Sequence, residues 1–132
     1  MIWFLRFFFL LVLASMLGVT GWASSQVSLF AIPRSVGGHP WFIAPLFDTY
    51  WAFFTFYVWL AYKEAAWLSR LLWFVAIVLL GNIAMSVYCL IQLCRVSSGA
   101  KIEQVLLRGP ALAWWIPAAL VSVAGGMAWA IA

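Results

Sequence analysis

Charged residues are scarce in this sequence. Only 8% of its 132 residues are Asp, Glu, Lys or Arg, whereas soluble domains carry roughly a quarter. Seven basic and three acidic residues are scattered along the chain, and no run of Lys and Arg is long enough to hold nucleic acid or a polybasic lipid site. These shortages exclude an ordinary soluble domain and a nucleic-acid partner.

The residue types that enzymes use are also few. The chain has one histidine, His39, and two cysteines, Cys89 and Cys94, whose spacing fits neither a CxxC motif nor a zinc or c-type haem site. No GxSxG or HExxH motif and no paired carboxylates occur. We therefore expect a protein that is not an enzyme, has no metal site and requires no cofactor. His39 is a weak candidate for an axial ligand of haem or chlorophyll, or for a proton carrier, but a lone loop histidine more often makes only a hydrogen bond.

Apolar and aromatic residues dominate the chain. Hydrophobic residues make up 68% of it, and ten are tryptophans. Since about 20 apolar residues cross a bilayer, the apolar segments predict four transmembrane helices, at about residues 1–23, 44–62, 68–93 and 110–131. The expected fold class is an all-α integral membrane protein whose four transmembrane helices form one compact bundle, a single domain of residues 1–132. Tryptophan favours the membrane-water interface, where we place Trp22, Trp41, Trp67, Trp114 and Trp115.

The connections between these segments are short. The first apolar segment has the outline of a signal peptide, but the chain keeps Met1, so we expect a retained membrane anchor. The Pro- and Gly-rich stretch 24–43 is a loop on the membrane surface. The turn at 62–67 is so short that the second and third helices must form a tight hairpin. Residues 95–109 form a short amphipathic turn, which four spans place on the same membrane side as the first loop.

Two polar residues of the second helix are expected to turn toward the bundle. Asp48 is costly near hydrocarbon unless a cation satisfies it, and we predict that it pairs with Arg108, with Arg34 as the alternative. Thr55 lies on the same helical face as Asp48 and is the expected hydrogen-bond partner of Asn82, at the centre of the third helix. Asn82 would then fix helix register.

The hairpin turn carries a charged pair, Lys63 and Glu64. Charges at a tight interfacial turn are usually solvated anchors, and that is the expectation here; the alternative is a substrate or proton site. Both cysteines are expected to be buried and reduced.

Small residues recur at every fourth position of the last helix and predict close packing against another helix. The stripe consists of Ala118, Ser122, Gly126 and Ala130. Its expected partner is either the first helix, through Ala14 and Gly18, or a neighbouring protein.

Several short motifs occur in a fixed order. They are Pro40-Trp41, Asp48-x-Tyr50, Tyr62-Lys63-Glu64-x-x-Trp67 and, last, residues 105–108, VLLR. In these elements, over about residues 40–108, the chain resembles a small membrane-protein family of plants and bacteria, the family of unknown function fourteen seventy-five. The resemblance implies a four-span membrane protein and no particular activity.

Two functions remain open. The first is a non-catalytic accessory or structural subunit of a larger membrane assembly, with energy-converting and pigment-containing assemblies as candidates. The alternative is a small membrane carrier or binder of a lipid, quinone, carotenoid or proton. The expected partners are the lipid bilayer and other membrane subunits. The expected location is the bacterial inner membrane, or alternatively a plant organelle membrane, with the N-terminus and the Lys63 turn inside.

Overall fold

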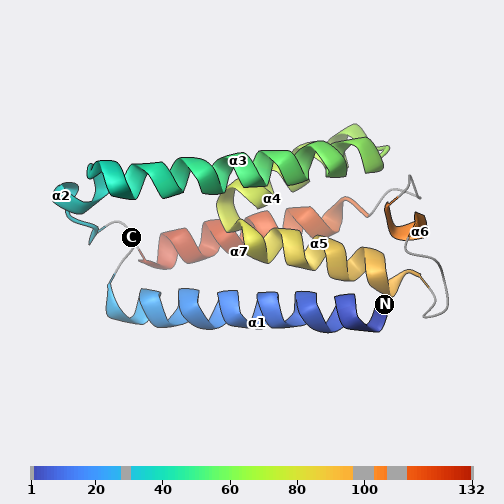
Figure 1. The fold of residues 1–132 in the computed structure, drawn as a ribbon, viewed down its shortest axis with the longest axis horizontal. Helices are drawn as coiled ribbons and strands as arrows, with labels where there is room; N and C mark the ends of the chain where they lie inside the picture. The colour runs from blue at the N-terminus through green and yellow to red at the C-terminus, as the bar shows by residue number, and fades with distance from the viewer. Residues whose placement is uncertain (1, 28–30, 97–102, 107–112, 132) are drawn as a thin grey trace.

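The structure is a computed structural model that describes residues 2–27, 31–96, 103–106 and 113–131. Every regular element in these ranges is an α-helix, which confirms the all-α class (Figure 1). The elements are α1 (Ile2–Gln26), α2 (Arg34–Gly37), α3 (Pro40–Lys63), α4 (Trp67–Leu80), α5 (Asn82–Cys94), α6 (Glu103–Leu106) and α7 (Trp115–Ile131).

The segment predicted as one helix over 68–93 is two helices that fold back on each other, so that prediction was wrong. Gly81 ends α4 with φ of 53° and ψ of −124°, a conformation that only glycine adopts without strain. The rings of Trp73 in α4 and Tyr88 in α5 lie 5.0 Å apart, whereas 15 residues of one helix would separate them by about 22 Å. Helices α4 and α5 are therefore a hairpin, and the chain after α5 returns to the end where α4 began.

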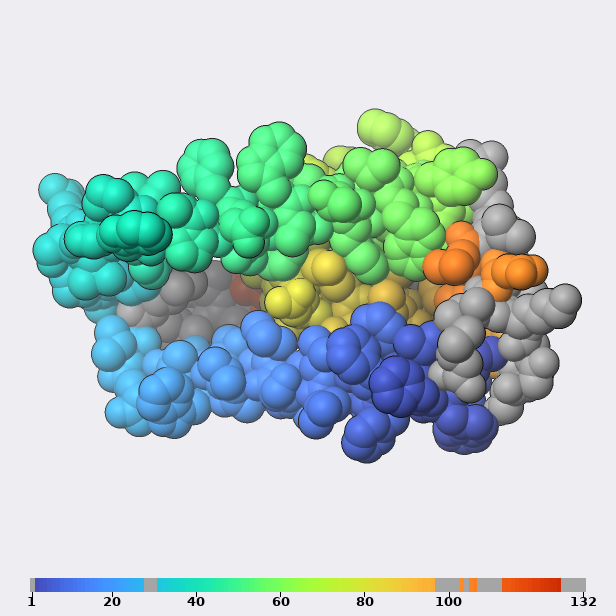
Figure 2. All heavy atoms as spheres, viewed as in Figure 1, coloured from blue at the N-terminus to red at the C-terminus, as the bar shows by residue number. Residues whose placement is uncertain are grey.

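This hairpin changes the topology of the whole chain. Helices α1 and α3 run the full length of the molecule and the shorter α7 runs alongside them, while α4 and α5 occupy the half that contains the start of α1 (Figure 1). Helix α5 packs along α1, and α4 packs against α3 and α7. Figure 2 shows α5 between α1 and α3 only at that end. The second loop thus begins at the Lys63 end, and the prediction that it shares a side with the first loop was wrong.

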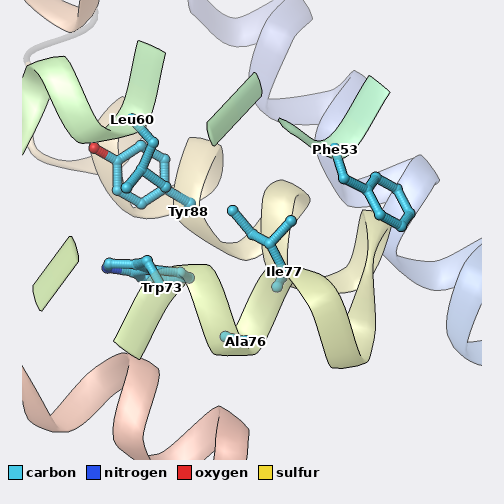
Figure 3. Close-up of a cluster of buried hydrophobic side chains, with 7 residues drawn as sticks. Phe53, Leu60, Trp73, Ala76, Ile77 and Tyr88 are labelled. Atoms are coloured by element: carbon cyan, nitrogen blue, oxygen red, sulfur yellow. The ribbon is translucent and has the colours of Figure 1, made fainter. Parts of the chain in front are cut away.

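The main apolar core lies where the hairpin meets α3. Its buried side chains come from three helices: Phe53 and Leu60 from α3; Trp73, Ala76 and Ile77 from α4; and Ala84 and Tyr88 from α5 (Figure 3). The Trp73 and Tyr88 rings pack edge to face at 80°, a favoured geometry for aromatic pairs. A smaller cluster of Ile2, Leu93 and Val105 joins the start of α1 to the end of α5 and to α6. Val105 thus anchors the amphipathic turn predicted for this loop.

Helix α1 is the one element in the described ranges that is both long and apolar enough to cross a membrane, a test that an N-terminal signal sequence also meets. Apart from Ile2, its residues are exposed or only partly buried. Large apolar side chains are also exposed along α3, among them Trp41, Phe47 and Val58. The outer surface of these two helices therefore carries many large apolar side chains.

Candidate functional site

The carboxylate of Glu64 is the centre of a buried polar cluster. Only 1% of the residue is exposed. The Ser69 hydroxyl donates to Glu64 Oε2 at 3.0 Å, and the Tyr88 hydroxyl donates to Oε1, also at 3.0 Å. The Gln92 amide donates to Oε1 at 3.5 Å. Both carboxylate oxygens are thus satisfied by side chains from α4 and α5, and we call Glu64, Ser69, Tyr88 and Gln92 the Glu64 cluster.

The turn between α3 and α4 places Glu64 in this cluster. The residue leaves the helix in an extended conformation, with φ of −74° and ψ of 129°. Arg70 Nε donates to the backbone oxygen of Glu64 at 2.7 Å and holds the turn closed. Ser69 lies in the first turn of α4, and Tyr88 and Gln92 lie one helical turn apart on α5. The cluster can form only because α5 returns along α4.

Lys63 belongs to the same buried region. It is 3% exposed. The Glu64 carboxylate attracts its ammonium group, whereas Arg95 at the end of α5 repels it. The prediction that Lys63 and Glu64 are solvated anchors was therefore wrong. Burying ionic groups costs free energy unless each is paired and hydrogen-bonded. Because the donors to the Glu64 carboxylate come from α4 and α5, the cluster holds the turn against the hairpin.

The chemistry available at the cluster is limited. It contains one carboxylate, and the groups around it are hydrogen-bond donors rather than a nucleophile with its base. In the described part of the chain no group of three or more His, Cys, Asp and Glu residues comes together to hold a metal. The arrangement suits a structural anchor better than a reaction centre.

Arg6 fixes α1 to the same end of the hairpin. Its Nη2 donates to the carbonyl oxygens of Leu93 at 2.8 Å and Val96 at 2.9 Å. A cation at a helix C-terminus also interacts favourably with the helix dipole. The guanidinium lies over the Trp3 ring, 4.9 Å from its centroid. Helix α1 is therefore attached through its first turns.

The face of α3 predicted to turn inward points away from the fold, so that prediction was wrong. Four of its five residues, Asp48, Ala52, Thr55 and Tyr62, are exposed, and the fifth, Trp59, is half-buried against the core. Another side of the helix buries Phe53 and Leu60 in the core. Phe53 and Leu60 fill the space against the hairpin, and the polar residues are left outside together with exposed apolar side chains such as Phe47. We call the four exposed residues the α3 polar face.

The predicted hydrogen bond between Thr55 and Asn82 is not formed. Thr55 donates to the Trp51 carbonyl of its own helix at 2.9 Å, and Asn82 is exposed at the start of α5, so Asn82 does not pair with Thr55. Arg108 lies outside the described residues.

The remaining candidates have mostly local roles. His39 is the N-cap residue of α3, and its Nδ1 accepts from the Trp41 backbone amide at 3.3 Å, which fits the simple hydrogen-bonding role. Cys89 is buried as expected, but Cys94 is exposed, so the prediction for Cys94 was wrong.

The small-residue stripe of α7 does not pack on α1. A Cβ added at Gly126 or at Gly18 would meet no atom within 4 Å. Ser122 is exposed and donates to the Ala118 carbonyl at 3.0 Å. The side chain of Ala130 lies outside the described part. The other predicted packing partner of the stripe, a neighbouring protein, stays a prediction.

Sequence reasoning missed the residues that complete the Glu64 cluster. None of Ser69, Tyr88 and Gln92 was singled out as a site residue. Tyr88 and Gln92 have the i, i+4 spacing of one helical face, but a continuous helix over 68–93 would have carried them away from Glu64. The missed signal was Gly81-Asn82, a typical helix end inside an apolar run.

One comparison with known proteins found a match. A family model described as "Protein of unknown function (DUF1475)" matches residues 34–111. It covers α3, the hairpin and the Glu64 cluster, and it confirms the predicted family resemblance. No curated protein and no solved structure matches the chain.

Proposed function

This chain belongs to the DUF1475 family of proteins of unknown function, and we propose that it is a non-catalytic subunit of a membrane assembly that packs against another membrane protein through the α3 polar face. The Glu64 cluster serves as the internal anchor that keeps α3 in position. The proposal is carried by one observation: Asp48, Ala52 and Thr55 are exposed together on one side of α3, whereas Phe53 and Leu60 are buried on another side.

The dimensions of the long helices suit a bilayer. Helices α1 and α3 have 25 and 24 residues, or about 36 Å, which exceeds the hydrocarbon thickness of about 30 Å. Helix α4 has 14 residues, or about 21 Å, and is too short to cross. In the proposed arrangement α1, α3 and α7 span the membrane, and α4 and α5 enter it from the Lys63 side and return. Three spans and a helical hairpin thus replace the four spans expected from the sequence.

Exposed tryptophans mark both ends of these helices, as the sequence predicts for an interface. Trp22 and Trp41 lie near the end of α1 and the start of α3, and Trp67 and Trp115 lie at the starts of α4 and α7. Amphipathic aromatic rings favour the head-group level on each side of a membrane. This distribution supports a bilayer around the long helices.

The polar face lies at a depth where lipid is a poor neighbour. Asp48 is about 5 Å along the axis from the midpoint of α3, well inside a hydrocarbon layer of about 30 Å. Ionisable side chains at that depth almost always face protein or water, and small residues allow a second helix to approach closely. Another protein helix satisfies both requirements.

The basic residues also favour one orientation. The end of the molecule that contains the Lys63 turn carries four basic residues, Arg6, Lys63, Arg70 and Arg95. The opposite end carries Arg34. Loops rich in Lys and Arg face the cytoplasm in a bacterial inner membrane. We therefore propose that the N-terminus and the Lys63 turn lie inside. With four spans the positive charges would be divided evenly between the two sides, and the hairpin removes this balance because it returns Arg95 to the Lys63 side.

We expect Ala52→Trp to separate the chain from its partner without unfolding it. The indole would occupy the space that a closely packed helix needs, and Ala52 is exposed in the isolated chain. The measurement is purification of the tagged chain in mild detergent, with the mass and composition of the complex determined. Wild type should co-purify with another membrane protein at a fixed ratio.

Val19→Trp is the matched control, because Val19 is 59% exposed on α1, away from α3. This variant should keep the partner. A wild-type chain that elutes alone, carrying only lipid or pigment, would contradict the proposed function.

That last outcome would support the alternative, a small carrier or binder. An apolar groove of about 280 Å³ follows α3 and is lined by Leu46, Phe47, Tyr50, Trp51 and Phe54. Its aromatic and aliphatic walls would suit the chain of a lipid, a quinone or a carotenoid. The position of Asp48 on a different side of the helix from this groove favours the subunit over the carrier.

A further inference from the structure

We propose that the helix packed on the α3 polar face carries a lysine or arginine at the depth of Asp48. This inference rests on the proposed function and names the chemistry of the partner. It makes Asp48 the recognition residue of the interface, whereas Ala52 and Thr55 provide the close approach.

Within the described residues Asp48 has no partner of its own. It is exposed, and no hydrogen bond or ion pair to it is formed in this part of the chain. The nearest basic residue in sequence, Arg34, belongs to α2, while Arg6, Lys63, Arg70 and Arg95 belong to the opposite end of the molecule. Asp48 therefore needs a cation from outside the described fold.

The dipole of α3 does not stabilise the Asp48 carboxylate sufficiently. Asp48 is the ninth residue of α3, and the favourable effect of a helix N-terminus on a carboxylate falls off within the first turn. The hydroxyl of the adjacent Thr49 donates to the Pro45 carbonyl oxygen at 2.8 Å, so it does not serve as a donor to Asp48. A carboxylate at this depth stays ionised at acceptable cost only when an opposite charge lies close to it.

Two other occupants fit the charge less well. A second copy related by a two-fold axis along the membrane normal would bring Asp48 against Asp48, and like charges at short range are unfavourable. A lipid ammonium group lies at the interface, about 15 Å from the bilayer centre, whereas Asp48 is about 5 Å from the midpoint of α3. A transmembrane helix with one basic residue can reach this depth.

The test combines two variants with a cross-linking map in cells. Asp48→Asn keeps the shape of the side chain and removes its charge, and Asp48→Lys reverses it. We expect recovery of the partner in mild detergent to fall about tenfold for Asp48→Asn, as loss of one close ion pair in a membrane interface implies, and to be abolished for Asp48→Lys. The control Glu103→Gln removes an exposed acid of α6 and should leave recovery unchanged.

A photo-reactive amino acid at Thr55, in otherwise wild-type chain, identifies the helix that faces Asp48. The peptide cross-linked to it should contain a lysine or arginine about two turns from the cross-link, because Asp48 lies seven residues from Thr55 on α3. Undiminished recovery with Asp48→Asn, a cross-linked helix without a basic residue, or a cross-link to a second copy would each overturn the inference and leave the subunit function standing. A wild-type chain without any partner would instead overturn the proposed function.

Discussion

Replacing Glu64 by alanine is expected to lower the free energy of unfolding by about 3 to 5 kcal/mol, because the buried partners of the carboxylate lose their acceptor. The hydroxyls of Ser69 and Tyr88 and the amide of Gln92 would then face a cavity. Lys63 would lose the neighbouring negative charge. For a chain of this size the loss corresponds to a fall of about 10 °C or more in Tm, measurable by tryptophan fluorescence in detergent.

Three controls separate the carboxylate from a general effect of mutation. Glu103→Ala removes an acid that is exposed on α6, and it should change stability by less than about 0.5 kcal/mol. Tyr88→Phe keeps the ring in the core and removes one donor, at a cost of about 1 to 2 kcal/mol. Glu64→Gln keeps an acceptor and should fall between wild type and Glu64→Ala. Equal losses for Glu64→Ala and Glu103→Ala would contradict the anchoring role of the cluster.

The second large effect is expected at Gly81. An alanine there has two costs, the backbone strain of φ at 53° and a Cβ placed 2.5 Å from Phe53 Cζ. Backbone strain of this kind and overpacking each cost about 1 to 3 kcal/mol. Gly81→Ala should therefore destabilise the hairpin strongly, and Tm in detergent reports the loss.

The strain and the clash can be measured separately. Adding Phe53→Ala to Gly81→Ala removes the ring, so the double variant should lose less than the sum of the single variants. The remainder is the cost of the backbone conformation. Gly18→Ala is the matched control: its Cβ would meet no atom within 4 Å, and alanine is the better helix former by about 1 kcal/mol. A Gly81→Ala variant as stable as Gly18→Ala would contradict the glycine-dependent turn.

The sequence was informative where composition and local spacing decide the structure. The apolar composition predicted an all-helical chain. The charges at Lys63 and Glu64 located the turn between α3 and α4, although Lys, Glu and Ala all favour helix. The motif order predicted the family that the comparison then found.

The predictions from the sequence failed where contacts between residues far apart in the sequence determine the structure. The run over 68–93 is apolar on both sides of Gly81, so hydropathy alone predicted one long span. The consequence reached further than α4 and α5, because it separated Glu64 from Tyr88 and Gln92 and placed Asp48 beside the second loop. The inward face of α3 was also misjudged, because Phe53 and Leu60 of α3, and not Asp48 and Thr55, are buried against α4 and α5.

The hairpin is the central claim, and the side of the membrane that Glu103 occupies tests it most directly. Single cysteines are placed at the exposed positions Ser35, Ala65 and Glu103 in a background of Cys89→Ala and Cys94→Ser. Intact cells and permeabilised cells are then treated with a membrane-impermeant maleimide. With the hairpin, Ala65 and Glu103 lie on one side and Ser35 on the other, so Ser35 reacts in intact cells and the other two only after permeabilisation. If Glu103 reacts together with Ser35, residues 67–94 cross the membrane as a single span and the hairpin is contradicted.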